Sequence, residues 1–162
     1  MSDVFSKQKR SDVMSRIRSR GNKDTELALM AFFRRHKITG WRRQVEIKTN
    51  AEKSVGKTRR FSVRPDFVFS KRKLAVFVDG CFWHGCPRHA TWPKGNAAFW
   101  RKKITGNQAR DRRVGRTLRK AGWRVVRIWE HALPRILRRT TKSPANTQET
   151  NLHERRLLRK FL

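Results

Sequence analysis

The chain has 162 residues, among them 42 Lys or Arg and 12 Asp or Glu, so its formal net charge is +30. Because a compact domain with this charge repels itself, we expect a polyanionic partner such as nucleic acid. The length predicts one domain. The sequence contains no apolar run of ~20 residues to span a membrane, no apolar leader typical of a secretory signal, and only two cysteines, too few for a disulfide scaffold.

The hydrophobic pattern predicts a mixed α/β domain. In chain order, the predicted elements are a helix over residues 24–37, strands over 41–47, 63–69 and 74–78, a helix over 97–121, a strand over 123–129 and a short helix near 131–138. Residues 48–61 are polar and predict an exposed basic loop, and residues 79–95 predict a second loop rich in Gly, Cys, His and Pro. This order predicts a small mixed sheet flanked by helices.

Helical spacing indicates which side chains face the core. In the helix at 24–37, Asp24 is the expected cap, and the positions at helical spacing are Leu27, Met30, Ala31 and either Phe33 or Arg34. In the helix at 97–121, the expected inward residues are Phe99, Trp100, Ile104, Val114 and Leu118. We place the domain at residues 21–140, between a basic arm at 1–20 and a polar, basic tail at 141–162 with one helical turn within 152–161.

Two cysteines and two histidines have the residue types of a zinc site. Cys81, Cys86 and His89 lie within nine residues, and His131 follows the last predicted strand. Zinc binds four such ligands in a tetrahedron, and a metal would close a loop that packing alone closes poorly. The alternative is that both cysteines are small buried apolar residues and both histidines lie on the surface.

Two carboxylates flank a predicted hairpin. Asp66 begins one strand and Asp79 follows the other, so pairing of the two strands would bring the acids close together. Hard cations such as Mg²⁺ are bound by one or two carboxylates, a main-chain carbonyl and water. The alternative is that the Pro-Asp pair only begins a turn. His84, in the following loop, fits a metal ligand, a general base or a solvated residue equally well.

Aromatic and basic side chains gather in the same part of the chain. Five aromatic residues lie within 19 positions: Phe82, Trp83, Trp92, Phe99 and Trp100. Aromatic wedges beside cations suit insertion between stacked bases, whereas the alternative is that they form the core beneath the loop. Basic residues cover the long helix at 97–121, where they either contact phosphate or form a solvated face.

Several separated segments of the chain also carry a family pattern. They are RSDVMSRIRSR…TE at 10–26, RPDFVF at 64–69, VFVDGCFWHGCPRH at 76–89, FWRKKITGN at 99–107, RDRR at 110–113 and GWRVVRIWE at 122–130. In this order they resemble the very short patch repair endonucleases, from about residue 8 to residue 135. The loop at 48–61 is longer than the family's usual link, and the resemblance does not extend beyond residue 140.

The resemblance implies a restriction-endonuclease-like fold and a catalytic site. Asp66 would bind a catalytic Mg²⁺ together with the main-chain carbonyl of Val78, His84 would activate water or transfer a proton, and Glu26 would support the site from the first helix. Asp79 would bind the metal or tune the site, since some members have His at this position. No lysine follows it to complete the acidic motif of many restriction enzymes, which raises the importance of His84.

The resemblance also implies a structural Zn²⁺ and a set of DNA contacts. The zinc ligands would be Cys81, Cys86, His89 and His131, although the family often has Cys at the last position. The DNA-contacting residues would be Phe82, Trp83 and Trp100, as wedges beside the mismatch, with Lys103, Asn107, Arg110, Arg112 and Arg113.

The implied activity is that of a DNA-repair hydrolase. It would nick one strand of duplex DNA at a T·G mismatch that arises when 5-methylcytosine deaminates. We expect a monomer in the bacterial cytoplasm, without membrane association, located on the nucleoid when bound to DNA and able to contact other mismatch-repair proteins. Two other functions stay open: a related nuclease with a different DNA target, and a non-catalytic basic protein that binds nucleic acid.

Overall fold

The computed structural model describes residues 8, 26–54, 57–93, 95–133 and 155–161. The predicted basic arm at 1–20 lies outside the described residues except for Gln8, as do the capping Asp24 and most of the predicted tail. Within the described residues, no helix is both long enough and apolar enough to cross a membrane.

The described elements follow the predicted order closely. The helices are α2 (Glu26–Arg35) and α3 (Ala97–Lys120), with short 3-10 turns at η1 (Ser70–Arg72) and η2 (Glu130–Ala132). The strands are β1 (Arg42–Arg43), β2 (Ile47–Ser54), β3 (Lys57–Val63), β4 (Phe67–Phe69), β5 (Leu74–Asp79) and β6 (Arg124–Trp129). Both long helices and the last two predicted strands are therefore confirmed.

The strands form one mixed sheet and one separate hairpin. The four-stranded sheet has the order β1-β4-β5-β6, in which β4 is antiparallel to β1 and β5, whereas β5 and β6 are parallel. Helix α3 makes the crossover between the two parallel strands, as a parallel pair requires. The remaining strands, β2 and β3, pair only with each other.

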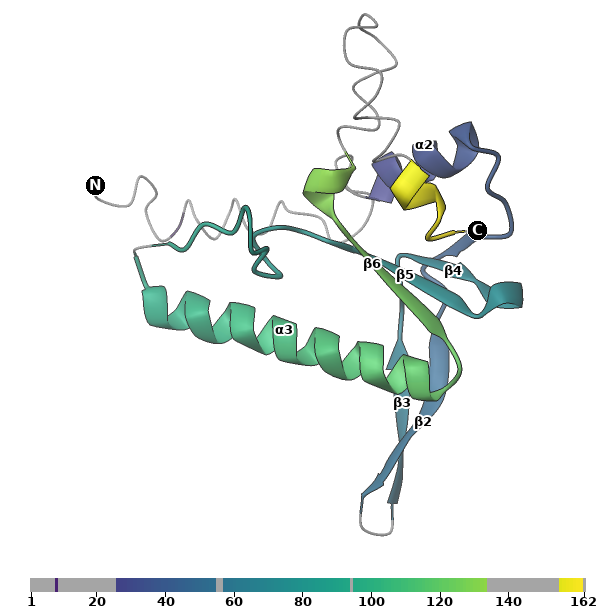
Figure 1. Cartoon of the computed structure of the whole chain (residues 1–162). Coiled ribbons are helices and arrows are strands. Elements are labelled where there is room, and N and C mark those ends of the chain that lie inside the picture. Colours follow the sequence, from purple (N-terminus) through teal and green to yellow (C-terminus); the bar gives the residue numbers. More distant parts are fainter. Residues whose placement is uncertain (1–7, 9–25, 55–56, 94, 134–154, 162) are drawn as a thin grey trace, which may run out of the picture.

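The sheet has a helix layer on each face (Figure 1). On one face, α2 packs its aromatic residues against β4 and β5, with Phe33 between Phe67 and Phe69 at ring distances of 5.2 and 5.5 Å. On the other face, Val114 and Leu118 of α3 pack in a smaller cluster. The mixed sheet flanked by helices is therefore confirmed.

The C-terminal segment contributes to the core. Residues 155–158 form a helical turn, consistent with the turn predicted within 152–161. Leu157 and Phe161 are buried against Phe32 and Phe33 of α2, and the guanidinium of Arg72 donates a hydrogen bond to the Phe161 carbonyl at 2.5 Å. A tail predicted as polar thus includes two apolar side chains that complete one face of the domain.

The predicted loop at 48–61 is wrong, because this segment is the β2–β3 hairpin. The polar composition hid the strands; among the hairpin side chains that the structure describes, Ile47, Phe61 and Val63 at the root pack with apolar neighbours. The adjoining strand predictions were too long. Gln44 has a positive φ of 54°, and Pro65 has no amide hydrogen for a strand ladder, so pairing in the main sheet is restricted to the short strands β1 and β4.

Two predictions about helix faces are also wrong. The buried face of α2 consists of Glu26, Ala28, Leu29, Phe32 and Phe33, so the prediction holds for Phe33 and, at the edge of the core, for Met30, but not for Leu27 and Ala31. The two large rings decide the rotation of the helix, because their burial removes most apolar surface from water. On α3, Phe99 is 51% exposed although its neighbour Trp100 is 8% exposed, so only one of these adjacent rings faces inward.

Candidate functional site

Asp66 lies at the point where three chain segments meet. It precedes β4, and its carboxylate Oδ2 accepts a hydrogen bond from the Val78 N–H of β5 at 2.7 Å. Its own carbonyl accepts a hydrogen bond from the Gln44 N–H at 3.3 Å. Because the N–H and carbonyl of one strand residue point to the same neighbour, the Val78 carbonyl opens toward the Asp66 side as well.

The electrostatic environment of Asp66 is unusual for a carboxylate in so basic a chain. The pKa of Asp66 is raised to about 6, mainly by burial and also by the nearby carboxylates of Glu26 and Asp79, against the lowering effects of the Val78 hydrogen bond and of Arg127. Excess negative charge at this point favours a bound cation, which would restore the ionised form. Asp66 and the Val78 carbonyl are therefore suitable ligands for a divalent cation.

Glu26 and Asp79 are the two buried charged residues of the described chain. Glu26 is paired with Arg43. Both oxygens of Asp79 accept hydrogen bonds from Arg127 on β6, at 2.6 Å from Nε and 2.5 Å from Nη2. Burial lowers the pKa of Arg127, but its hydrogen bonds and charge interactions with Asp79 and Asp111 together raise it more, so the guanidinium stays charged. Both carboxylate oxygens of Asp79 are thus occupied by Arg127. This geometry fits a residue that adjusts the charge of the site better than a direct metal ligand.

His84 joins this group through a second carboxylate that the sequence analysis missed. Its Nδ1 lies 2.5 Å from Oδ2 of Asp111, on α3, and 3.7 Å from Oδ1 of Asp79. Nη2 of Arg127 also lies 3.2 Å from Asp111. We call Asp79, His84, Asp111 and Arg127 the acid–histidine cluster. The signal for Asp111 was present, because it is the single acid in a helix otherwise rich in arginine and lysine.

The loop that carries His84 is fixed from α3. The Asn107 side-chain amide donates to the Trp83 carbonyl at 2.9 Å, and that of Gln108 donates to the His84 carbonyl at 3.2 Å. Gly85 has a positive φ of 62°, and a Cβ there would lie 2.5 Å from Nε2 of Gln108. Asn107 was predicted to contact DNA; in the structure its amide supports the loop, and a DNA contact from it stays a prediction.

The predicted zinc ligands lie together. One donor atom from each of Cys81, Cys86, His89 and His131 lies within 4.8 Å of the others. Nδ1 of His131 is 3.1 Å from Sγ of Cys81 and 3.6 Å from Sγ of Cys86, and Nδ1 of His89 is 3.8 Å from the latter. Ligands of a tetrahedral Zn²⁺ are separated by about 3.3–3.8 Å, given bonds of about 2.0–2.3 Å. These four residues, the Cys–His cluster, therefore fit the ion.

Both cysteines are free thiols in buried positions. Burial raises the pKa of the Cys81 thiol to about 11. A bound cation favours the thiolate instead, because metal ligation deprotonates the sulfur. His131 lies at the end of β6, so metal binding at the Cys–His cluster would connect the loop to the sheet.

The predicted aromatic wedges differ in exposure. Phe82, Trp83 and Trp100 contact one another, with ring centroids 5.2 to 6.0 Å apart. Trp100 is buried, and Phe82 and Trp83 are half-buried, whereas Trp92 and Phe99 are the exposed large apolar residues of the described chain. The geometry therefore favours Trp100 as a support for the other two rings, and insertion of any ring into DNA stays a prediction.

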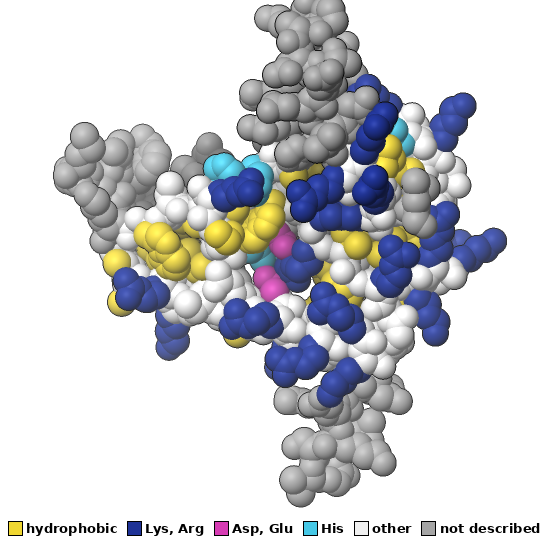
Figure 2. Space-filling model, in the orientation of Figure 1, with side chains coloured by type: hydrophobic (Ala, Val, Ile, Leu, Met, Phe, Trp, Pro, Cys, Tyr) yellow, Lys and Arg dark blue, Asp and Glu magenta, His cyan; other side chains and the backbone are white. Residues whose placement is uncertain are grey.

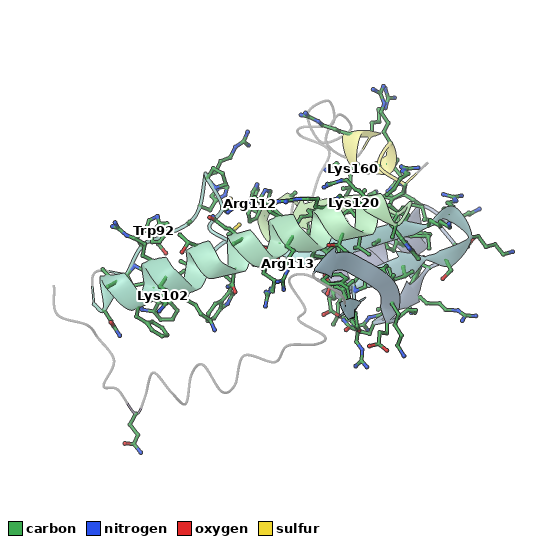
Figure 3. The ribbon with its side chains drawn as sticks, turned by 90° about the horizontal axis from the view of Figure 1, so that it is seen from below. Trp92, Lys102, Arg112, Arg113, Lys120 and Lys160 are labelled. Carbon is green, nitrogen blue, oxygen red and sulfur yellow. The ribbon has the colours of Figure 1, made fainter. Side chains whose placement is uncertain are left out.

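Cations surround the acids on one face of the molecule. Figure 2 shows the acidic side chains near the centre of this face, among lysines and arginines. The predicted DNA-contacting cations of α3 are all exposed: Lys103, Arg110, Arg112 and Arg113. In Figure 3, Trp92 and Lys102 lie near the amino-terminal end of α3, and Arg112 and Arg113 lie further along it. A basic helix thus runs beside the acid–histidine cluster.

Comparisons with known proteins identify relatives of this arrangement. A family model described as DNA mismatch endonuclease Vsr matches residues 53–89. The type II nicking enzyme V.NmeAIP of Neisseria meningitidis is 38% identical over 132 residues, which cover 80% of this chain and 83% of the relative.

Two shorter alignments are closer in sequence. The type II nicking enzyme V.NaeI of Lentzea aerocolonigenes is 55% identical over 69 residues, or 43% of this chain and 42% of that relative. The DNA mismatch endonuclease Vsr of Escherichia coli is 42% identical over 74 residues, or 43% of this chain and 46% of that relative. In these two cases the chain matches less than half the length of the relative. The long alignment nevertheless spans most of both proteins, and this chain therefore belongs to the Vsr family.

Proposed function

We propose that the chain is a Mg²⁺-dependent endonuclease that nicks one strand of duplex DNA at a T·G mismatch left by deamination of 5-methylcytosine, and so starts very short patch repair. The observation that carries the proposal is that Asp79, whose charge acts on Asp66, also lies 3.7 Å from His84, which Asp111 holds beside a basic helix. A protein that only binds DNA has no need for buried carboxylates in so cationic a chain. The proposal implies a cytoplasmic protein that works on the nucleoid.

His84 is the proposed general base. When Nδ1 donates its hydrogen to the Asp111 carboxylate, at 2.5 Å, the lone pair remains on Nε2. That nitrogen can then take a proton from a water that attacks the phosphorus. Asp111 keeps the ring oriented and stabilises the imidazolium that forms, as a carboxylate beside a catalytic histidine does elsewhere.

Asp66 and the Val78 carbonyl are the proposed ligands of the catalytic cation. A divalent cation there would supply Lewis-acid stabilisation of the negative charge that develops on the phosphate. Glu26, on α2, raises the pKa of Asp66, so its negative charge also favours a cation at this position. Asp79 is a positioning residue, since Arg127 holds it and also approaches Asp111.

The proposed recognition of the mismatch depends on the aromatic loop. Phe82 and Trp83 are carried by the same loop as His84, with Trp100 behind them. Insertion of a ring between base pairs costs a few kcal/mol, and the cost is smallest at a mispaired step. The arginines of α3 would provide phosphate contacts that do not depend on sequence.

The experiment that tests the proposal compares nicking of duplexes that differ only in one base pair, T·G or T·A, with and without Mg²⁺. We expect nicking of the T·G duplex alone, dependent on the cation, and its loss in Asp66→Asn. Equal nicking of both duplexes would instead support a related nuclease with another target. Binding without nicking of either duplex would support the non-catalytic alternative.

A further inference from the structure

The proposed catalytic site gives no role to the β2–β3 hairpin. It pairs with no strand of the main sheet and extends away from it past α3 (Figure 1). Its root is anchored, because Ile47 is buried and Phe61 and Val63 pack with it in the α3-side cluster. Beyond the Thr49–Phe61 pair, the ribbon leaves the core.

The composition of the outer part argues against a structural role. Residues 50–60, NAEKSVGKTRR, contain four cations and one acid, and only Ala51 and Val55 are apolar. An isolated two-stranded ribbon is marginally stable at best in water, and this one has little apolar surface to bury. A segment of this kind adds little to the stability of the domain, so its length and charge point to a partner.

We propose that the hairpin is a second DNA-binding arm, which lies in the major groove to one side of the nicked site. The major groove of B-form DNA, about 12 Å wide, admits a two-stranded ribbon. The excess of cations complements phosphate, whereas a protein partner would require an apolar centre to the interface. The proposal rests on the proposed function, because it assigns the arm to the same duplex.

The position of the arm sets where it reaches. Its second strand ends at Val63, and only Arg64 and Pro65 separate it from Asp66. The six steps from Val63 to Lys57 span about 20 Å at about 3.3 Å each. That length corresponds to about six base pairs at 3.4 Å per pair. The arm therefore begins beside the candidate catalytic carboxylate and extends the contact by about half a turn of DNA.

The test is the salt dependence of binding, measured without divalent cation so that no strand is cut. One variant replaces the four arm cations by serine: Lys53, Lys57, Arg59 and Arg60. A matched control replaces four exposed cations outside both the arm and α3: Arg34, Lys71, Arg155 and Arg156. On a long duplex, we expect the arm variant to lower the slope of log K against log salt by up to about 3.6, at about 0.9 per contact, and the control to lower it by less than one.

Two duplexes with the mismatch near opposite ends locate the contact. The arm variant should lose affinity only for the duplex that extends past the mismatch on the arm side. A second variant, in which Asn-Gly replaces residues 50–60, should show the same selective loss, while retention of the wild-type melting temperature shows that the root still folds.

The arm proposal is overturned if the arm variant and the control have equal slopes, or if both duplexes are affected alike. It is also overturned if an RNA duplex shows the same loss, because the major groove of A-form RNA is too narrow to admit the ribbon. Failure of the proposed function would look different: wild-type protein would bind these duplexes with the arm-dependent slope and still not nick them when Mg²⁺ is added.

Discussion

The Cys–His cluster and the acid–histidine cluster both include residues of the loop at 79–95, yet their side chains suit different roles. The Cys–His cluster offers two soft sulfur donors and two borderline imidazole donors at tetrahedral spacing, and His131 connects it to the end of β6. The acid–histidine cluster contains two carboxylates, an arginine and a histidine, next to Asp66 with its raised pKa. A metal with four protein ligands stabilises a fold and leaves no position for a substrate. Ionisable groups with shifted pKa values are instead typical of catalytic sites.

The largest expected effect comes from removing metal from the Cys–His cluster. Loss of a structural zinc is among the changes that cost more than about 4 kcal/mol of unfolding free energy. We expect one Zn²⁺ per chain in protein purified without a metal-affinity tag, and a large fall in melting temperature when a strong chelator is added. Elemental analysis and thermal unfolding measure both quantities.

The Cys86→Ser variant serves as the internal control for this prediction. Because it already lacks a ligand, its lower melting temperature should respond little to the chelator. Full stability of wild-type protein without metal would contradict the zinc assignment and return both cysteines to a simple role as buried apolar residues.

The next largest effect is expected in the acid–histidine cluster, on rate rather than stability. His84→Gln should slow single-turnover nicking by ~10²–10⁴-fold, the usual contribution of a general base. Asp111→Asn should act through the same histidine, so the double variant should be no slower than His84→Gln alone. If the rate losses of the two single variants add up in the double variant, the two residues act separately, despite the 2.5 Å between His84 Nδ1 and Asp111 Oδ2.

A smaller effect concerns the stability of metal-free protein. Because the pKa of Asp66 in the folded chain, about 6, exceeds its unfolded value, the folded state binds the proton more strongly between pH ~4 and ~6. The free energy of unfolding should therefore fall as pH rises through this range. Asp66→Asn keeps an acceptor for Val78 and lacks this fall, so at pH 7 it should be the more stable protein by up to about 3 kcal/mol.

Urea unfolding of both proteins at several pH values, with a chelator for divalent hard cations present, measures this difference. In a separate series without the chelator, added Mg²⁺ should stabilise wild-type protein at pH 7 and leave Asp66→Asn unchanged, since the cation and the proton compete for the same carboxylate. A wild-type protein as stable as the variant at every pH would contradict the raised pKa of Asp66 in the folded protein.

The smallest effects separate mismatch recognition from phosphate contact. Trp83→Ala should reduce the preference for T·G over T·A duplex with little change in the salt slope, because stacking releases no counterions. Arg112→Ala and Arg113→Ala should each lower the slope by up to about one and weaken both duplexes alike. Binding of both duplexes over a salt series measures all three variants. A Trp83→Ala protein that unfolds but keeps the preference would assign that ring to the core.

The sequence predicted the parts of the fold that have a strong apolar period. The helix at 97–121 and the strands at 74–78 and 123–129 were recovered within a residue or two. The β2–β3 hairpin was missed because residues 50–60 are mostly polar, so the sequence there has no alternation of apolar and polar residues to detect. The rotation of α2 was missed because Phe32 and Phe33 are adjacent, and spacing alone does not show which rings fit the sheet.

The residues of the candidate site were likewise predicted only where a sequence pattern joins them. The Cys–His cluster was predicted from residue type and spacing, and all four side chains lie together. Asp111 was missed because its link to His84 joins positions 27 apart, and no local pattern connects a loop histidine to an acid in a basic helix. Arg127 was missed for the same reason, since its pairing with Asp79 depends on the parallel alignment of β5 and β6.

The most direct test of the central claim is Asp66→Asn, assayed for binding and for single-turnover nicking of the same T·G duplex. An amide is a poor ligand for Mg²⁺, whereas affinity for DNA comes largely from phosphate contacts elsewhere. We predict that nicking is lost while the affinity measured without Mg²⁺ stays within a few-fold of wild type. A variant that nicks at the wild-type rate, or loses binding and nicking to the same extent, would contradict the assignment of Asp66 as the catalytic metal ligand.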